Sequence, residues 1–301
     1  MKNIGILSGI AASAIWGGMY VISKVVLDVV PPFTLLTIRL VLGSLTLGII
    51  IALKGGTGFS RSQFLQVMGV GWVGYGVSVS LQFIGTKLST ASNGALVTSS
   101  VPAFILLFAA LIMHERITAR KLLALLISSI GVLVVIDLRS MRLSPDLFLG
   151  NLSLAAASVT WGLYSVLVRK ITRNLDTLPV SLVAFWGGFL VTLPGSAWEL
   201  KNVGIGALTP GVIWGILYLG IISTALAMYL WNYAFATLEA GVASLTLFAQ
   251  PLVGAGLGAL FLGERLTSLF LIGGLLICLG LWLASTGTTI TPPSRDSGIP
   301  V

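Results

Sequence analysis

The sequence predicts an all-α membrane protein with ten transmembrane helices, arranged as two inverted five-helix repeats. The first observation behind this prediction is composition: mean hydropathy is +1.04, 56% of the 301 residues are hydrophobic, and 9% are charged. Soluble domains carry about 25% charged residues. The second observation is a series of apolar runs near the roughly 20 residues that cross a bilayer. The third is an internal repeat, which decides the architecture.

Two blocks of sequence occur twice in the chain. One recurs at an offset of 145 residues (161 − 16) and the other at 149 (251 − 102). The matches include Trp16 with Trp161, Gly17 with Gly162, Pro102 with Pro251, and Glu115 with Glu264. They predict a first repeat over residues 1–137, a linker over 138–147 and a second repeat over 148–286. The remaining tail, 287–301, is rich in Thr, Pro and Ser and is predicted to be disordered.

Hydropathy and the turn-forming residues between apolar runs place the ten spans. They are 4–23, 33–53, 64–85, 92–113, 119–136, 148–168, 178–197, 211–236, 241–262 and 268–285. The first span is not predicted to be a cleaved signal peptide, because its apolar run is longer than a usual signal core. The interior span that begins at residue 148 also repeats its sequence.

The charges in the loops predict a multi-pass protein of the cell membrane with both ends in the cytoplasm. With the N-terminus inside, the inner loops hold ten Lys and Arg residues and the outer loops hold six, as the positive-inside rule requires. Each repeat has an odd number of spans, so the second half enters the membrane with the opposite orientation. Inverted repeats hold their binding site near the middle of the bilayer.

Polar and aromatic side chains at helical spacing predict a cavity between the repeats that binds a small molecule. Ser13, Trp16 and Tyr20 share one face of the first span, and polar groups within a bilayer face a cavity or another helix. The predicted substrate-binding residues are Trp16, Tyr20, Arg39, Tyr75, Ser78, Gln82, Asn93, Trp161, Tyr164, Tyr229, Asn232 and Gln250. Alternatively, Ser and Thr side chains bond only to backbone or to a neighbouring helix.

Three further features have two interpretations each. Arg39 is the charge that lies well inside a span, and it either extends to the membrane surface or meets a carboxylate of the substrate. Pro102 and Pro251 lie in mid-span, where they either act as hinges or only shape the packing. Glu115 and Glu264 lie at the exits of their spans, where they either latch a gate on each membrane face or pair with the next helix.

The sequence argues against several other classes of protein. None of the nine acidic residues lies near the middle of a span, His114 is in a loop, and Cys278 has no Cys or His partner in sequence. We therefore predict no metal site and no catalytic residue. The chain has no G-x-S-x-G turn and no P-loop, which argues against a serine hydrolase and against ATP. The net charge of +8 is spread over short loops, so no nucleic-acid partner is predicted.

Taken in order, these motifs resemble the EamA type of the drug/metabolite transporter superfamily over about residues 4–286. The resemblance rests on the duplicated five-span layout, the two Trp-Gly pairs, Arg39-Leu40 and the shared Pro-to-Glu spacing. It implies a ten-helix fold, a central cavity and alternating-access movement of small metabolites, commonly the export of amino acids. The seventh span departs from symmetry, because Ala184 or Phe185 stands where a counterpart of Arg39 would be.

Together these features predict a secondary transporter that exports small organic metabolites, such as amino acids or related neutral or zwitterionic compounds. It is predicted to be a monomer without enzymatic activity or cofactor, with the bilayer and a small-molecule substrate as its partners. The absence of a carboxylate in mid-span favours uniport or exchange over proton antiport. The competing hypothesis is a channel-like or non-transporting membrane protein, such as a receptor or assembly factor, that uses the same fold.

Overall fold

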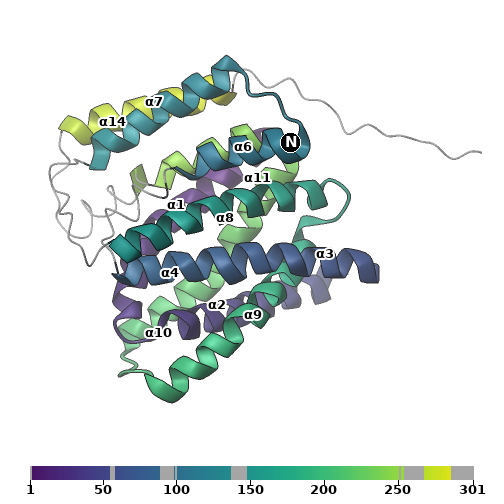
Figure 1. Cartoon of the computed structure of the whole chain (residues 1–301), viewed down its shortest axis with the longest axis vertical. Coiled ribbons are helices and arrows are strands. Elements are labelled where there is room, and N and C mark those ends of the chain that lie inside the picture. Colours follow the sequence, from purple (N-terminus) through teal and green to yellow (C-terminus); the bar gives the residue numbers. More distant parts are fainter. Residues whose placement is uncertain are drawn as a thin grey trace, which may run out of the picture.

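The computed structural model describes residues 2–54, 58–88, 98, 100–136, 148–250, 252–253 and 268–285, and every regular element in these ranges is a helix (Figure 1). Six of the described helices are long and apolar enough to cross a bilayer. Val101–Met113 and Leu271–Gly280 are shorter apolar helices. The chain is therefore a multi-pass membrane protein.

The helices fall into two series along the chain. The first contains α1 (Lys2–Leu27), α2 (Pro32–Lys54), α3 (Arg61–Gly71), η1 (Trp72–Ser78), α4 (Val79–Leu88), α6 (Val101–Met113) and α7 (Ala119–Ile136). The second contains α8 (Phe148–Thr172), α9 (Thr177–Asn202), α10 (Pro210–Leu217), η4 (Tyr218–Leu226), α11 (Ala227–Thr237), α12 (Ala240–Leu245), η5 (Thr246–Phe248) and α14 (Ser268–Ser285). Each predicted span overlaps one or more of these helices. Asn93, Pro251, Glu264 and the segments 138–147 and 287–301 lie outside the described residues.

Short-range signals set the ends of several helices. Ser60 and Gln63 form a capping box at the start of α3, each side chain accepting a hydrogen bond from the backbone N–H of the other. Thr209 caps α10, and Pro210 occupies its first turn. At the other end of a helix, α6 stops at His114, whose φ of 56° is left-handed and turns the chain out of the helix.

A carboxylate from the second half caps the N-terminus of α2 in the first half. Glu199 of α9 accepts hydrogen bonds from the backbone N–H groups of Phe33 (3.1 Å) and Thr34 (2.7 Å). It also accepts one from the Thr34 hydroxyl (2.9 Å). The first amides of a helix lack intrahelical partners and carry partial positive charge. The buried carboxylate therefore satisfies these amides and fastens α2 to α9.

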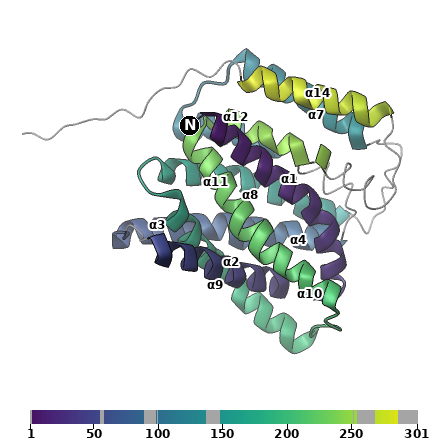
Figure 2. The ribbon, with the colours of Figure 1, turned by 180° about the vertical axis from the view of Figure 1, so that it is seen from behind.

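Helix contacts within the bundle recur with the two halves exchanged. α1 packs along α11 as α4 packs along α8, and α12 and η5 pack on α1 as α6 packs on α8. The two most extensive contacts join equivalent helices, α2 with α9 and α7 with α14. Figures 1 and 2 show α7 and α14 side by side at one edge of the bundle. The two halves thus share one packing plan.

Both halves also contain a π-helical segment at an equivalent place. η1 begins at Trp72 and η4 begins at Tyr218, 146 residues later (218 − 72). Each lies inside a continuous span, Arg61–Leu88 or Pro210–Thr237. π-helical turns are rare in proteins overall, and those that occur often lie at functional sites. The matching pair therefore marks the residues of η1 and η4 as candidates for a functional site.

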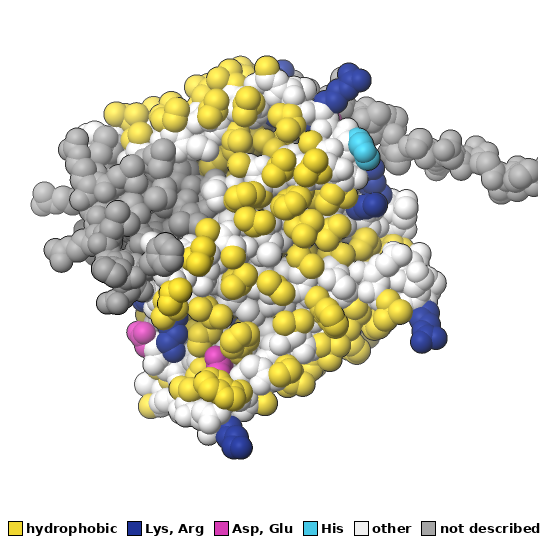
Figure 3. Space-filling view, viewed as in Figure 1, with side chains coloured by type: hydrophobic (Ala, Val, Ile, Leu, Met, Phe, Trp, Pro, Cys, Tyr) yellow, Lys and Arg dark blue, Asp and Glu magenta, His cyan; other side chains and the backbone are white. Residues whose placement is uncertain are grey.

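Hydrophobic side chains dominate the outer surface of the bundle. Leu111, Trp214 and Leu275 are examples, with exposed fractions of 64%, 72% and 72%. On the face seen in Figure 3, hydrophobic side chains spread over the middle, while Lys, Arg and His side chains lie mostly towards the edges. Apolar exposure on this scale is unfavourable in water but suits contact with lipid.

The structure places Pro102 differently from the mid-span position that the sequence predicts. α6 begins at Val101, so Pro102 lies in its first turn, where a missing N–H costs no intrahelical hydrogen bond. The described part of α6 therefore gives no reason for a kink at Pro102. Pro194, which the sequence pattern did not single out, lies inside α9.

A substitution at Gly71 tests the close packing of α3 on α9. A Cβ atom at Gly71 would overlap the backbone oxygen of Ala184, whereas one at Gly69 would meet nothing within 4 Å. We expect Gly71→Ala to lower the free energy of unfolding by about 1–3 kcal/mol. Gly69→Ala should be neutral or stabilising, because alanine favours helix. Size-exclusion chromatography after heating in detergent measures both variants, and equal melting temperatures would contradict the prediction.

Candidate functional site

A cavity of about 40 Å³ lies between the two halves. Five of the predicted substrate-binding residues line it: Trp16, Ser78, Gln82, Trp161 and Gln250. The first four come from α1, η1, α4 and α8, and Gln250 lies just after the end of η5. These elements are far apart in sequence. The space would hold about three water molecules, so a metabolite can enter only if the cavity widens.

The remaining lining residues were not predicted as binding residues. They are Met19, Thr98, Val101, Leu154, Ala157, Ser158, Met228 and Leu247. None of these described lining side chains is charged. The wall therefore combines aromatic rings, flexible thioethers and neutral hydrogen-bonding groups, the usual make-up of a small-molecule site.

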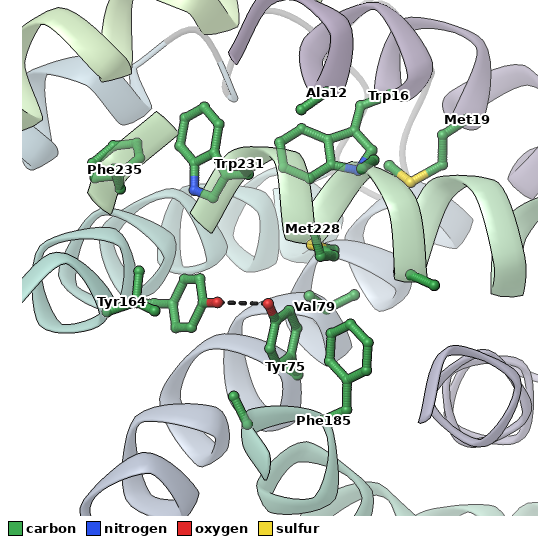
Figure 4. Packing of buried hydrophobic residues seen from close by; sticks show 14 of the residues in the cluster. Ala12, Trp16, Met19, Tyr75, Val79, Tyr164, Phe185, Met228, Trp231 and Phe235 are labelled. Atoms are coloured by element: carbon green, nitrogen blue, oxygen red, sulfur yellow. Dashed lines mark hydrogen bonds between the residues drawn. The ribbon is translucent and has the colours of Figure 1, made fainter. Parts of the chain in front are cut away.

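Three tryptophans lie together at this cavity. Trp16 of α1 meets Trp161 of α8 edge to face, with ring centroids 5.7 Å apart, and lies 5.4 Å from Trp231 of α11. Trp161 and Trp231 are stacked at 6.3 Å. Such arrangements suit the ring quadrupoles. Because Trp16 belongs to one half and its two neighbours belong to the other, the cluster joins the repeats. Figure 4 shows Trp16 and Trp231 of this cluster.

Hydrogen bonds fix the orientation of the residues on the α1 side. The indole N–H of Trp16 donates to the backbone oxygen of Ser223 in η4 at 3.1 Å. The Tyr20 hydroxyl receives a hydrogen bond from the Gln82 amide (2.8 Å) and shares another with Thr98 (2.9 Å). Tyr20 is thus held beside the cavity by two of its lining residues.

A closed ring of hydrogen bonds lies next to the tryptophans. The amide nitrogen of Asn232 donates to the Tyr75 hydroxyl at 3.3 Å, and the Tyr164 hydroxyl donates to the Asn232 amide oxygen at 2.8 Å. The hydroxyls of Tyr75 and Tyr164 bond to each other and complete the ring (Figure 4). Asn232 also donates to Ser181 of α9 at 2.9 Å. All four residues are buried, and they tie η1 to three helices of the second half.

Ion pairs mark the end of the bundle where α6 and α8 finish. Arg169 of α8 pairs with Glu115 at 3.0 Å and donates to the backbone oxygen of Phe235 at 2.9 Å. Lys121 of α7 pairs with Glu239, just before α12, at 2.6 Å. In both pairs one partner belongs to each half. The left-handed turn at His114 carries Glu115 out of α6 towards this contact.

The cavity and the ion pairs are separated by fully buried side chains. Arg169 is eight residues after Trp161, which is about 12 Å along an α-helix. Between them on α8 lies Tyr164, and on the facing α11 lie Trp231 and Phe235, each fully buried. Tightly packed side chains therefore close the bundle between the cavity and the ion pairs.

Arg39 is buried beside the cavity and does not extend to the membrane surface. Its side chain is 1% exposed. The Nε–H donates to Leu219 O at 3.1 Å and to Thr224 Oγ1 at 3.0 Å. Nη2 lies 3.3 Å from Ser223 Oγ and 3.7 Å from Met19 Sδ. The guanidinium also stacks on Phe83, at 4.8 Å from the ring centroid.

The structure does not bring all predicted residues to the cavity. Tyr229 is partly exposed and packs on Tyr233 at 6.2 Å, away from the lining. Tyr75, Tyr164 and Asn232 form the neighbouring ring of hydrogen bonds instead of the wall itself. Among the described residues, no group of three or more His, Cys, Asp or Glu side chains could hold a metal ion.

Several hydroxyls follow the alternative that the sequence left open. Ser13 donates to Gly9 O, Ser158 to Leu154 O and Ser165 to Trp161 O, each one turn back in its own helix. Ser78 instead donates across the halves to Ala157 O at 2.8 Å. A hydroxyl on the predicted face is thus no proof of a free polar group.

Comparison with known proteins agrees with this fold. Residues 3–137 and 148–286 each match the EamA-like transporter family. Because the two matches cover most of the chain, the protein belongs to the EamA-like transporter family. A solved crystal structure of a protein with 22% sequence identity has a TM-score of 0.79 and covers 95% of this chain and 98% of its own. That likeness shows the fold.

Relatives of this chain carry the names of transporters. The chain is 22% identical to the uncharacterized transporter YoaV of Bacillus subtilis over 281 residues, which cover 91% of this chain and 94% of YoaV. It is 27% identical over 300 residues to a protein of Salmonella typhimurium named as a probable amino-acid metabolite efflux pump. That match covers 94% of this chain and 95% of the Salmonella protein.

A substitution at Tyr164 tests the ring of hydrogen bonds formed by Tyr75, Tyr164 and Asn232. Tyr164→Phe removes the donor to Asn232 and the acceptor of Tyr75, which leaves buried polar atoms without partners. We expect the free energy of unfolding to fall by about 1–3 kcal/mol. Tyr229→Phe, at a partly exposed site, should change it by less than about 0.5 kcal/mol. Thermal denaturation in one detergent compares the two variants, and similar losses would show that the ring contributes nothing specific.

Proposed function

We propose that this protein is a secondary transporter that exports small organic metabolites, such as amino acids or related neutral or zwitterionic compounds, by alternating access. The observation that carries the proposal is the cavity of aromatic and neutral polar side chains between the two halves. Its wall includes residues of both repeats, so a relative movement of the halves changes its width. The name of the Salmonella relative supports amino-acid export.

The sealed end supports a mechanism in which the two ends open in turn. Buried aromatic side chains and two ion pairs between the halves close the bundle on the side of Glu115 and Glu239. A solute could pass only if these contacts separate. The repeat places Glu264 in the second half where Glu115 stands in the first. We propose that the two carboxylates serve gates at opposite ends, and that Pro251 contributes a hinge.

The membrane arrangement is part of the same proposal. Ten spans in two inverted repeats, over 1–137 and 148–286, would place both termini in the cytoplasm. The excess of Lys and Arg in the inner loops supports this orientation. The ion pairs would then lie on the cytoplasmic side. A monomer in the cell membrane suffices, because both halves of the cavity belong to one chain.

Counterflow in proteoliposomes tests the transporter. Vesicles loaded with one unlabelled amino acid should accumulate the labelled form, with each of the twenty tried in turn. Trp161→Ala should reduce the rate by about tenfold or more, since a large aromatic ring in a binding site contributes over about 1.4 kcal/mol. Trp214→Ala, on the lipid-facing surface, should not change it.

Two other outcomes of this assay favour the competing hypotheses. Flux that does not saturate and shows no counterflow indicates a channel. Absence of flux with every amino acid, together with a panel of amines and nucleosides, indicates a receptor or assembly factor.

The ion pair of Glu115 and Arg169 predicts the accessibility of the sealed end. In a Cys278→Ser background, a cysteine at Ser165 should react slowly with a maleimide, because Ser165 is fully buried. Glu115→Gln should raise the reaction rate by about tenfold, the effect of removing about 1.4 kcal/mol from the closed state. Arg173→Gln, at an exposed site nearby, should not raise it. Equal rates in the Glu115 and Arg173 variants would exclude a latch.

A further inference from the structure

The guanidinium of Arg39 lacks a negatively charged partner among the described residues. Lys121 and Arg169 each pair with a glutamate, whereas no carboxylate in the described part of the chain pairs with Arg39. Its Nη1 atom is buried and has no hydrogen-bond partner. An unpaired charge in a low-dielectric interior is costly, and charges inside membranes usually pair or mark a substrate pathway.

The contacts of the guanidinium weaken from one side of the group to the other. Nε makes two hydrogen bonds of 3.0 and 3.1 Å to Thr224 and Leu219. Nη2 has only longer contacts, 3.3 Å to Ser223 and 3.7 Å to the weak acceptor sulfur of Met19. Nη1 has none. The group is thus anchored through Nε, and its Nη1–Nη2 edge remains available to a two-oxygen acceptor, the geometry in which guanidinium binds carboxylate.

This edge lies one side chain away from the cavity. Met19 touches Nη2 and also lines the cavity. Ser223 touches Nη2 through its hydroxyl and holds the indole of Trp16 through its carbonyl. Methionine is unbranched and adapts its shape readily. A rotation of the Met19 side chain would therefore expose the guanidinium to a ligand in the cavity.

The repeat argues against a purely structural need for the charge. Ala184 or Phe185 of α9 occupies the position equivalent to Arg39, at an offset of 145 (184 − 39) or 146 (185 − 39). Both residues are apolar and fully buried. The same element of the shared fold is thus built with an apolar residue in the second half. Of these two equivalent positions, the one that lies next to the cavity carries the cation.

We propose that Arg39 binds the carboxylate of the transported solute through its Nη1–Nη2 edge after Met19 moves aside. The inference rests on the proposed function and narrows it: the solutes are small carboxylates, including amino acids, and the tryptophans contact the rest of the molecule. The solute carboxylate supplies the negative charge that the described part of the protein does not place there.

Matched pairs of acids and amides test this subsite. Purified protein is heated with each amino acid and short-chain carboxylate of a panel, and with the carboxamide of each, which differs mainly by the lost charge. We expect one or more acids to stabilise the wild type and the matching amides to bind about tenfold to a hundredfold more weakly, the effect of a charge-assisted hydrogen-bond pair.

Variants of Arg39 assign this preference to the residue. Arg39→Gln should bind acid and amide alike, Arg39→Lys should keep part of the preference, and Lys54→Gln at the exposed end of the same helix should keep all of it. Ser223→Asp places a carboxylate beside Nη2. It should leave the unliganded protein folded and weaken acid binding, which decides the question if Arg39→Gln does not fold.

Several results would overturn the subsite. They are wild-type binding of amides as tight as acids, no stabilisation by any carboxylate, or an acid preference that survives in Arg39→Gln or Ser223→Asp. Counterflow separates this failure from failure of the transporter itself. If the wild type exchanges amines or amides and Arg39→Gln does so equally, the protein transports but Arg39 is not a carboxylate site. If the wild type exchanges no solute, the proposed function is wrong.

Discussion

The fold depends on one constraint: a polar group inside the hydrocarbon must find its partner within the protein. Most hydroxyls in the spans meet it locally, as Ser13 does by donating to the oxygen one turn back. Glu199 meets it across the halves by capping α2. The ring of Tyr75, Tyr164 and Asn232 meets it among side chains alone. The contacts of Glu199 and of this ring also join one repeat to the other, so here polar satisfaction contributes to the assembly of the two halves.

The π-helical segments extend this solution to the backbone. In an α-helix the main-chain oxygens are taken by the N–H groups one turn later, whereas a wider turn disturbs that pattern and can leave oxygens to side chains. In η4 the oxygen of Leu219 accepts from Arg39 and from Thr224, and the oxygen of Ser223 accepts from Trp16. One irregular stretch of the second half therefore positions both a charge and an indole of the first half beside the cavity.

The sequence predicts the repeat and the faces of the helices well, because both depend on residues close together in the chain. The spacing of Ser13, Trp16 and Tyr20 is a property of one helix, and five predicted residues do meet at the cavity. Contacts between helices were not predictable. Arg169 and Glu115 are 54 residues apart (169 − 115) and no local pattern links them. Tyr229 was predicted because it is an aromatic residue with a polar group in its span, but its side chain faces away from the lining and packs on Tyr233.

The two halves are alike in frame and unlike in charge, and this difference bears on the mechanism. Arg169 donates to Phe235 O in one half as Lys24 donates to Thr86 O in the other, with offsets of 145 (169 − 24) and 149 (235 − 86). Each contact joins the end of one long helix to the end of a π-containing span, and the two lie at opposite ends of the bundle. Arg39, which has the apolar Ala184 or Phe185 as its counterpart, belongs to only one half, so the cavity has an asymmetric wall inside a nearly symmetric frame.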